Sequence, residues 1–140
     1  MKRFAAEVTI HAPAEAIWSI LTDGPNYPAW NSTVERIDGR IAPGEKLTIH
    51  LRPAQARAFP VTVSAFEPAT RMVWTGGLSF GLFTGTRVFK LTPRPDGAVA
   101  FDMREEYAGL LAPLIGKSIP DLQPAFDAFA ADLKRRAERI

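Results

Sequence analysis

The chain has 140 residues, a length that suits one domain over residues 1–140 and allows roughly two-thirds of the unfolded surface to be buried. Its formal net charge of +2 is too small to indicate a nucleic-acid partner, and 46% hydrophobic with 23% charged residues is typical of a soluble globular protein. The absence of cysteine excludes disulfide bonds, thiolate metal sites and thiol catalysis, and it fits a reducing compartment.

The amino-terminal part predicts a strand followed by short helices. Apolar and polar residues alternate over residues 4–10, as in a half-buried strand. No apolar run here is long enough for a signal peptide or a membrane span, so we expect a cytoplasmic location and no stable membrane insertion. Pro13 fits the first turn of a helix that ends at residues 23–25, and Pro28 places Trp30 on a short irregular helix or a loop.

From residue 33 onward the sequence predicts strands joined by turns. Short apolar runs are separated by turn residues such as Asp38-Gly39 and the segment 93–97. This pattern is typical of an antiparallel meander. The expected strands cover residues 33–37, 47–51, 59–65, 72–74, 87–91 and 99–107.

The carboxy-terminal part predicts one long amphipathic helix. Five apolar residues recur at steps of three and four between 119 and 133. A helix over residues 119–139 would be about 30 Å long, enough to lie across a whole sheet. Its start is open: with Ser118 as the cap, Pro124 should kink the helix, whereas with Asp121 as the cap Pro124 falls in the first turn and is tolerated.

Two adjacent glutamates, Glu105 and Glu106, lie near the end of the last expected strand. Successive side chains of a strand point to opposite faces, so one glutamate must share a face with Phe101 and Met103. A shift of one residue would expose the whole apolar set. Glu105 is therefore the inward glutamate.

The hairpin formed by the last two strands places a cation near Glu105. Pairing Leu91 with Val99 puts Arg87 opposite Met103 and diagonal to Glu105, on the same face. An inward carboxylate can pair with a cation, keep contact with water at a cavity mouth, or take up a proton. We favour the ion pair, because a planar guanidinium suits a carboxylate.

Several short motifs carry a resemblance to a known superfamily. They are Val8-x-Ile10-x-Ala12-Pro13, Ala16-Ile17-Trp18-x-x-Leu21-Thr22-Asp23, Tyr27-Pro28-x-Trp30-Asn31, Pro43-Gly44-Glu45, Met72-Val73-Trp74-x-Gly76, Gly81-Leu82-Phe83-x-Gly85 and Arg104-Glu105-Glu106-Tyr107-x-Gly109-Leu110-Leu111. In these motifs and in its order of elements, the chain resembles the SRPBCC superfamily, which includes START-like and polyketide cyclase/dehydrase-like proteins. The resemblance implies an α+β helix-grip fold. In this fold a seven-stranded curved antiparallel sheet wraps around a long C-terminal helix, with two short helices between strands 1 and 2.

The resemblance also implies a cavity between the sheet and the last helix. Such cavities are mostly apolar with a few polar groups, so we expect a small hydrophobic ligand, lipid-like or aromatic and polyketide-like, and no cofactor. The expected lining residues are Ile49, Leu51, Phe59, Val61, Val63, Trp74, Arg87, Phe89, Phe101, Met103, Glu105, Tyr107, Leu122, Phe126 and Phe129. Trp30, Asn31 and Phe83 are expected at the rim. For Trp30 and Asn31 we favour a structural interpretation over ligand contact: Trp30 fills one end of the core, and Asn31 caps the local backbone.

Other functions are compatible with the same residues. In a cyclase/dehydrase-type enzyme, Glu105 would move a proton while Arg87 stabilises an enolate oxygen. The pair can also be purely structural. An interaction module, such as a toxin partner or a coenzyme-Q chaperone of the same fold, is a further possibility. We expect a monomer or homodimer.

His11 and His50 should face solvent, which argues against a histidine metal site and a Ser-His-Asp triad.

Overall fold

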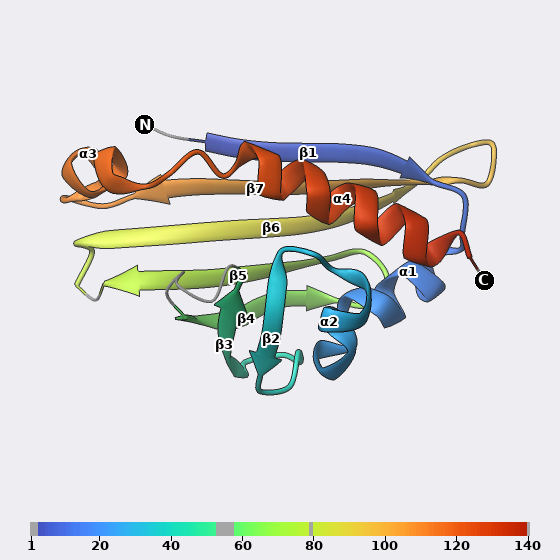
Figure 1. The fold of residues 1–140 in the computed structure, drawn as a ribbon, viewed down its shortest axis with the longest axis horizontal. Coiled ribbons are helices and arrows are strands. Elements are labelled where there is room, and N and C mark those ends of the chain that lie inside the picture. The colour runs from blue at the N-terminus through green and yellow to red at the C-terminus, as the bar shows by residue number, and fades with distance from the viewer. Residues whose placement is uncertain (1–2, 53–57, 79, 140) are drawn as a thin grey trace.

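The computed structural model describes residues 3–52, 58–78 and 80–139. Within these residues seven strands form one antiparallel sheet in the order β1-β7-β6-β5-β4-β3-β2 (Figure 1). The predicted meander and helix-grip fold are therefore confirmed. The strands are β1 (Arg3–Ile10), β2 (Val34–Asp38), β3 (Lys46–Leu51), β4 (Phe59–Glu67), β5 (Arg71–Leu78), β6 (Phe83–Pro93) and β7 (Val99–Ala108).

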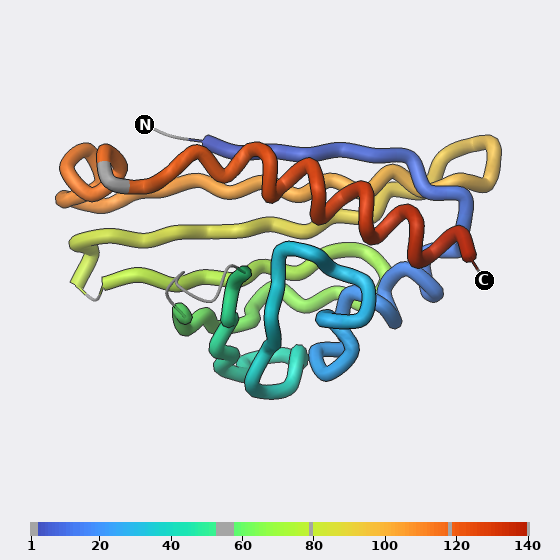
Figure 2. Tube along the Cα trace, viewed as in Figure 1, coloured from blue at the N-terminus to red at the C-terminus, as the bar shows by residue number. Residues whose placement is uncertain are grey.

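Over the same described residues, four α-helices and two short 3₁₀ turns accompany the sheet. The long helix α4 runs along β1 and β7, and α1 lies near its carboxy-terminal end (Figures 1 and 2). None of the helices in the described part of the chain has the length and hydrophobicity needed to span a bilayer. The helical elements are α1 (Ala14–Leu21), η1 (Gly24–Asn26), α2 (Tyr27–Trp30), α3 (Ala112–Ile115), η2 (Gly116–Ser118) and α4 (Gln123–Ala137).

The last helix begins later than residue 119, so that part of the prediction is wrong. With 15 residues, α4 is about 22 Å long. Pro124 falls in its first turn, where its missing N–H costs nothing, and the carboxylate of Asp121 accepts a hydrogen bond from the Gln123 N–H at 3.1 Å. The N-cap is Leu122, one residue after the predicted alternative Asp121, and Pro124 is in the first turn as that alternative predicted. The segment before α4 contains α3 and η2, which the sequence pattern did not predict.

The pairing of β6 with β7 differs from the prediction by two residues. Leu91 lies opposite Phe101 rather than Val99, because both strands continue until only residues 94–98 are left for the turn. Inside this turn the Arg94 N–H donates to the Ala98 carbonyl at 2.8 Å. Because the shift is even, every side chain stays on its predicted face.

A β-bulge ends the alternation of β4 earlier than predicted. The register shifts between Ser64 and Glu67, and Ala65 has a φ of +47° and is exposed. The ring of Phe66 turns inward instead and contacts Trp18 of α1, with 5.3 Å between ring centroids. The bulge thus joins the end of β4 to the first helix.

Polar side chains of α4 bind the free edge of β1. The amide of Gln123 donates to the Ala5 carbonyl at 2.6 Å, and the ammonium of Lys134 donates to the Thr9 carbonyl at 2.7 Å. Exposed strand edges invite pairing with other chains, and these contacts occupy part of that edge. They also fix α4 to the β1 edge of the sheet.

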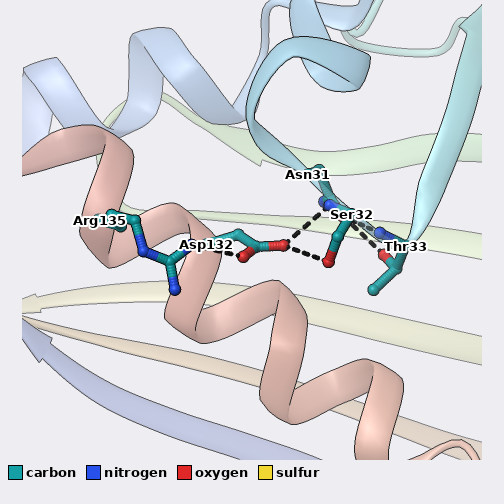
Figure 3. Close-up of polar contacts among 5 residues, drawn as sticks. All are labelled: Asn31, Ser32, Thr33, Asp132 and Arg135. Atoms are coloured by element: carbon teal, nitrogen blue, oxygen red, sulfur yellow. Dashed lines mark hydrogen bonds and ion pairs between the residues drawn. The ribbon is translucent and has the colours of Figure 1, made fainter.

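Asp132 of α4 fixes the helix near the opposite edge of the sheet, at the loop before the edge strand β2 (Figure 3). Its Oδ2 accepts hydrogen bonds from the Ser32 N–H at 2.8 Å and from the Ser32 hydroxyl at 2.7 Å, and its Oδ1 accepts one from Arg135 at 2.9 Å. Asn31 shapes the same loop, because its Oδ1 accepts hydrogen bonds from the N–H and the hydroxyl of Thr33. The helix is therefore held between both edges of the sheet.

Replacing Asp132 by asparagine should lower the free energy of unfolding by about 1–2 kcal/mol at neutral pH. Burial alone would raise the pKa of Asp132, but the hydrogen bonds from Ser32 and the Arg135 guanidinium outweigh it and hold the pKa below its ordinary value. A lowered pKa stabilises the fold above the unfolded-state value of about 4, and this stabilisation is lost as the pH falls through the folded-state value. In urea unfolding, the difference between wild type and Asp132→Asn should therefore shrink below about pH 4. A pH-independent difference would contradict this, and exposed Asp127→Asn is the control.

Candidate functional site

Arg87 and Glu105 form an ion pair on the inner face of the sheet, as predicted. The guanidinium Nε lies 3.0 Å from the carboxylate Oε1, and the two side chains are only 15% and 13% exposed. The two residues are direct cross-strand neighbours on β6 and β7, not diagonal ones, because of the register of the hairpin. Their charges balance each other within a largely apolar surface.

Tyr107 completes a three-residue network. Its hydroxyl donates to Glu105 Oε2 at 2.5 Å, so each carboxylate oxygen has one partner in the network. Gly85 lies opposite Tyr107, and a Cβ atom at Gly85 would lie 3.3 Å from the tyrosine ring. The missing side chain thus makes room for the ring, which stacks against Phe83 with 5.6 Å between centroids.

Arg87 keeps hydrogen-bond donors that this network does not use. Its guanidinium carbon lies 4.6 Å from the centroid of the Phe126 ring, a cation–π contact that brings α4 over the pair. Among the described residues, the guanidinium donates only through Nε, which leaves Nη1 and Nη2 without an acceptor. Trp74 lies directly opposite Arg87 on β5, and its buried indole N–H also has no partner there. This row of the inner face can therefore donate hydrogen bonds to a ligand.

Both tyrosines of the chain should resist ionisation until the protein unfolds in alkali. Burial raises the pKa of Tyr27, and burial together with the Glu105 carboxylate raises that of Tyr107. A raised pKa stabilises the fold fully below the unfolded value of about 10, and the stabilisation is lost as the pH rises toward the folded value. Tyrosinate absorbance should therefore increase together with the loss of circular dichroism. An increase near pH 10 with the fold intact would contradict this placement.

Apart from the Arg87–Glu105 pair, the residues predicted to line the cavity, together with the predicted rim residue Phe83, divide into two groups. A fully packed group fills the centre of the inner face, where rings from α4 reach the sheet: Phe129 lies 6.0 Å from Phe89 and 6.2 Å from Phe101 between centroids. In this part the aromatic side chains pack as core, which leaves no room there for the predicted cavity between the sheet and the last helix. The buried members are Ile49, Val61, Val63, Trp74, Phe89, Phe101, Met103, Tyr107, Phe126 and Phe129.

The second group is partly exposed and gathers at one end of the sheet. Leu51 ends β3, Phe59 begins β4, Phe83 begins β6, and Leu122 immediately precedes α4. The antiparallel register places the ends of β3, β4 and β6 at the same end of the sheet, with Arg87 four residues further along β6 than Phe83. Leu122 precedes Gln123, whose amide binds the Ala5 carbonyl of β1. We call this region, formed by Leu51, Phe59, Phe83 and Leu122, the open end of the inner face.

Two surface hollows lie away from this region. One, of about 360 Å³, lies on the outer face of β6 and β7 and is lined by residues such as Lys90 and Arg104. The other, of about 540 Å³, lies between β1 and α4. Arg87 lines neither of them. Both have charged walls, so neither is a pocket of the predicted hydrophobic kind.

The predicted rim residues do not lie together. Trp30 and Asn31 are buried, with 9% and 1% exposure, so their placement at an open rim is wrong. Trp30 packs against Tyr27 and Phe129, and Asn31 holds the loop before β2, which agrees with the core-plug and backbone-cap interpretation. Phe83 alone borders the open end.

The two histidines differ from each other in their surroundings. His11 is exposed, as expected, but His50 is half-buried, and its Nε2 lies 2.7 Å from Asp38 Oδ2. His50 is on the outer face of β3, as expected, but Asp38 of β2 covers part of its side chain. The hydrogen bond from His50 lowers the pKa of Asp38. No group of three or more metal-ligating side chains occurs among the residues with described positions.

Comparison with known protein families gives a match over nearly the whole chain. Residues 1–138 fit the family described as polyketide cyclase / dehydrase and lipid transport. The chain belongs to this family. The predicted SRPBCC-type relationship is thereby confirmed, and no curated protein sequence matches the chain significantly.

Solved structures of similar shape share the fold of this chain. Protein MLL2253 from Mesorhizobium loti has a TM-score of 0.75 at 22% identity, with 99% of this chain and 98% of that chain covered. The Zhui aromatase/cyclase from Streptomyces sp. R1128 has a TM-score of 0.76 at 13% identity, covering 99% and 94%. A START superfamily protein from Mycobacterium smegmatis has a TM-score of 0.69 at 19% identity, covering 98% and 97%. At these identities the likeness shows the fold alone.

Proposed function

We propose that this protein binds a small hydrophobic molecule at the open end of the inner face, with a polar atom of the ligand held by Arg87. The observation that carries the proposal is a largely buried ion pair beside an apolar wall, in which Nη1 and Nη2 of the guanidinium have no acceptor among the residues that the structure describes. Ligand sites commonly combine apolar walls with a few such polar groups. The family description, which includes lipid transport, supports a ligand of this kind.

The charge balance of the site favours a neutral polar group on the ligand. Glu105 already compensates the positive charge of Arg87, so an incoming anion would gain little net attraction. The guanidinium donors that Glu105 does not use match an acceptor oxygen such as that of a carbonyl or hydroxyl group. Binding at the open end moves only partly exposed side chains, whereas deeper binding would displace tightly packed rings.

A second candidate is an enzyme of the polyketide cyclase/dehydrase type. It is favoured by the Tyr107 hydroxyl, which is hydrogen-bonded to Glu105 and could pass a proton to or from it. The free nitrogens of Arg87 would then stabilise an enolate oxygen. Glu105→Gln separates the two candidates: a carrier keeps most of its binding, whereas an acid–base enzyme loses about 10²-fold or more in turnover. Glu106→Gln, on the outer face, is the matched control.

Native mass spectrometry of the freshly purified protein tests the binding proposal. We expect a fraction of the protein to carry the added mass of a small molecule. Arg87→Leu should lose this adduct, whereas Arg104→Leu should keep it, because the ion pair of Arg104 with Asp102 lies on the outer face. An adduct retained in Arg87→Leu would overturn the proposal.

A further inference from the structure

The large apolar side chains that the described part of the chain exposes are confined to two neighbouring segments. Leu78 and Phe80, 52% and 98% exposed, lie at the turn between β5 and β6, and Leu110 and Leu114, 80% and 68% exposed, lie after β7. Both segments project at the same end of the molecule (Figure 1). We call these four residues the apolar tip.

Backbone hydrogen bonds join the two segments into one surface. The Leu110 N–H donates to the Gly81 carbonyl at 3.0 Å, and the Leu111 N–H donates to the Leu82 carbonyl at 2.7 Å. Because Phe83 follows directly and begins β6, the apolar tip is continuous with the open end of the inner face. The tip is thus a fixed extension of the candidate site.

The charge pattern of these segments indicates what covers the tip. Residues 75–86 contain no charged side chain, and residues 107–120 contain only Lys117. A surface of exposed apolar groups with one cation and no carboxylate suits the interface of a bilayer with anionic lipids, where apolar side chains enter the headgroup region and acidic ones are repelled. Apolar patches of this kind on soluble proteins mark interaction sites.

We infer that the apolar tip docks the protein peripherally on membrane surfaces that contain anionic lipid. Docking in this orientation would turn the open end toward the bilayer, so a hydrophobic ligand could pass between lipid and protein without crossing water. That consequence rests on the proposed binding function, but the docking itself does not. A second copy of the chain is the competing occupant, and the experiment distinguishes the two.

Flotation with lipid vesicles tests the inference. The wild-type protein should float with vesicles of mixed phosphatidylcholine and phosphatidylglycerol, and less with phosphatidylcholine alone. Phe80→Ser should weaken binding to the mixed vesicles by about tenfold, which corresponds to the loss of one inserted aromatic side chain. Pro95→Ser, an exposed position in the turn at the opposite end of the β6–β7 hairpin, should bind like the wild type. Leu114→Ser repeats the test on the second segment.

Three outcomes would overturn the inference: no binding of the wild type to mixed vesicles, unchanged binding of both tip variants, or light scattering that shows a wild-type dimer which Phe80→Ser dissociates. The last would assign the tip to a second copy of the chain. Circular dichroism confirms that the variants are folded. Arg87→Leu should still bind vesicles, and Phe80→Ser should keep any co-purified adduct in native mass spectrometry. Failure of docking and failure of ligand binding are therefore distinguishable.

Discussion

Replacing Glu105 by leucine should lower the free energy of unfolding by about 3 kcal/mol. The substitution leaves the guanidinium of Arg87 inside the protein with no carboxylate partner, and Arg87 is only 15% exposed. It also removes the acceptor of the Tyr107 hydroxyl. Urea unfolding followed by tryptophan fluorescence and by circular dichroism measures the change.

Glu106→Leu is the matched control for this prediction. The Glu106 side chain is 62% exposed and lies 3.8 Å from Arg3, a surface pair that contributes little. Its loss should change the free energy of unfolding by less than about 0.5 kcal/mol. The double variant Arg87→Met with Glu105→Leu should recover most of the lost stability, because no buried charge is left unpaired. Equal effects of Glu105→Leu and Glu106→Leu would contradict the inward placement of Glu105.

Replacing Phe129 by alanine should cost about 4 kcal/mol of stability, a larger effect than that of Glu105→Leu. Phe129 is 2% exposed, and its ring contacts those of Tyr27, Trp30 and Phe89, so it joins α4 to α2 and to the sheet. Its removal leaves a cavity that these fixed neighbours cannot fill. The measurement is again urea unfolding, with the denaturation midpoint and the slope determined separately.

Phe83→Ala is the control for Phe129→Ala. Phe83 is partly exposed and stacks on Tyr107, so its loss should cost about 1 kcal/mol. If Phe129→Ala cost no more than Phe83→Ala, the centre of the inner face would not be a packed core. A wide cavity beneath α4 would then account better for the result.

The inward position of Glu105 could be predicted from the sequence because it depends only on parity. Side chains alternate strictly along a strand, and Phe101 and Met103 fix which face is buried. The predicted pairing of β6 with β7 differs from the observed one by two residues, because several turns fit a segment with Pro93 and Pro95. Alternation cannot distinguish between registers that differ by an even number of residues. The contact between Arg87 and Glu105 is predicted by both registers, because the long Arg87 side chain reaches a directly opposite or a diagonal carboxylate.

The packed interior and the anchoring of α4 could not be predicted in the same way. Apolar periodicity marks a buried face, but it does not distinguish a cavity wall from a filled core, because both use residues such as Phe89 and Phe126. The contact of Asp132 with Ser32 joins residues 100 positions apart, and no local pattern points to it. The segment before α4 also carries no long periodic run, so α3 left no clear signal.

The most direct test of the proposed binding site is a crystal structure of the protein as purified, without added ligand. We predict electron density at the open end of the inner face, between Phe83 and Leu122, with a polar atom within hydrogen-bond distance of Arg87 Nη1 or Nη2. The proposal would be contradicted if density for a small molecule appeared only in one of the outer hollows. In that case no ligand would lie beside Arg87, and the Arg87–Glu105 pair would be open to bulk water.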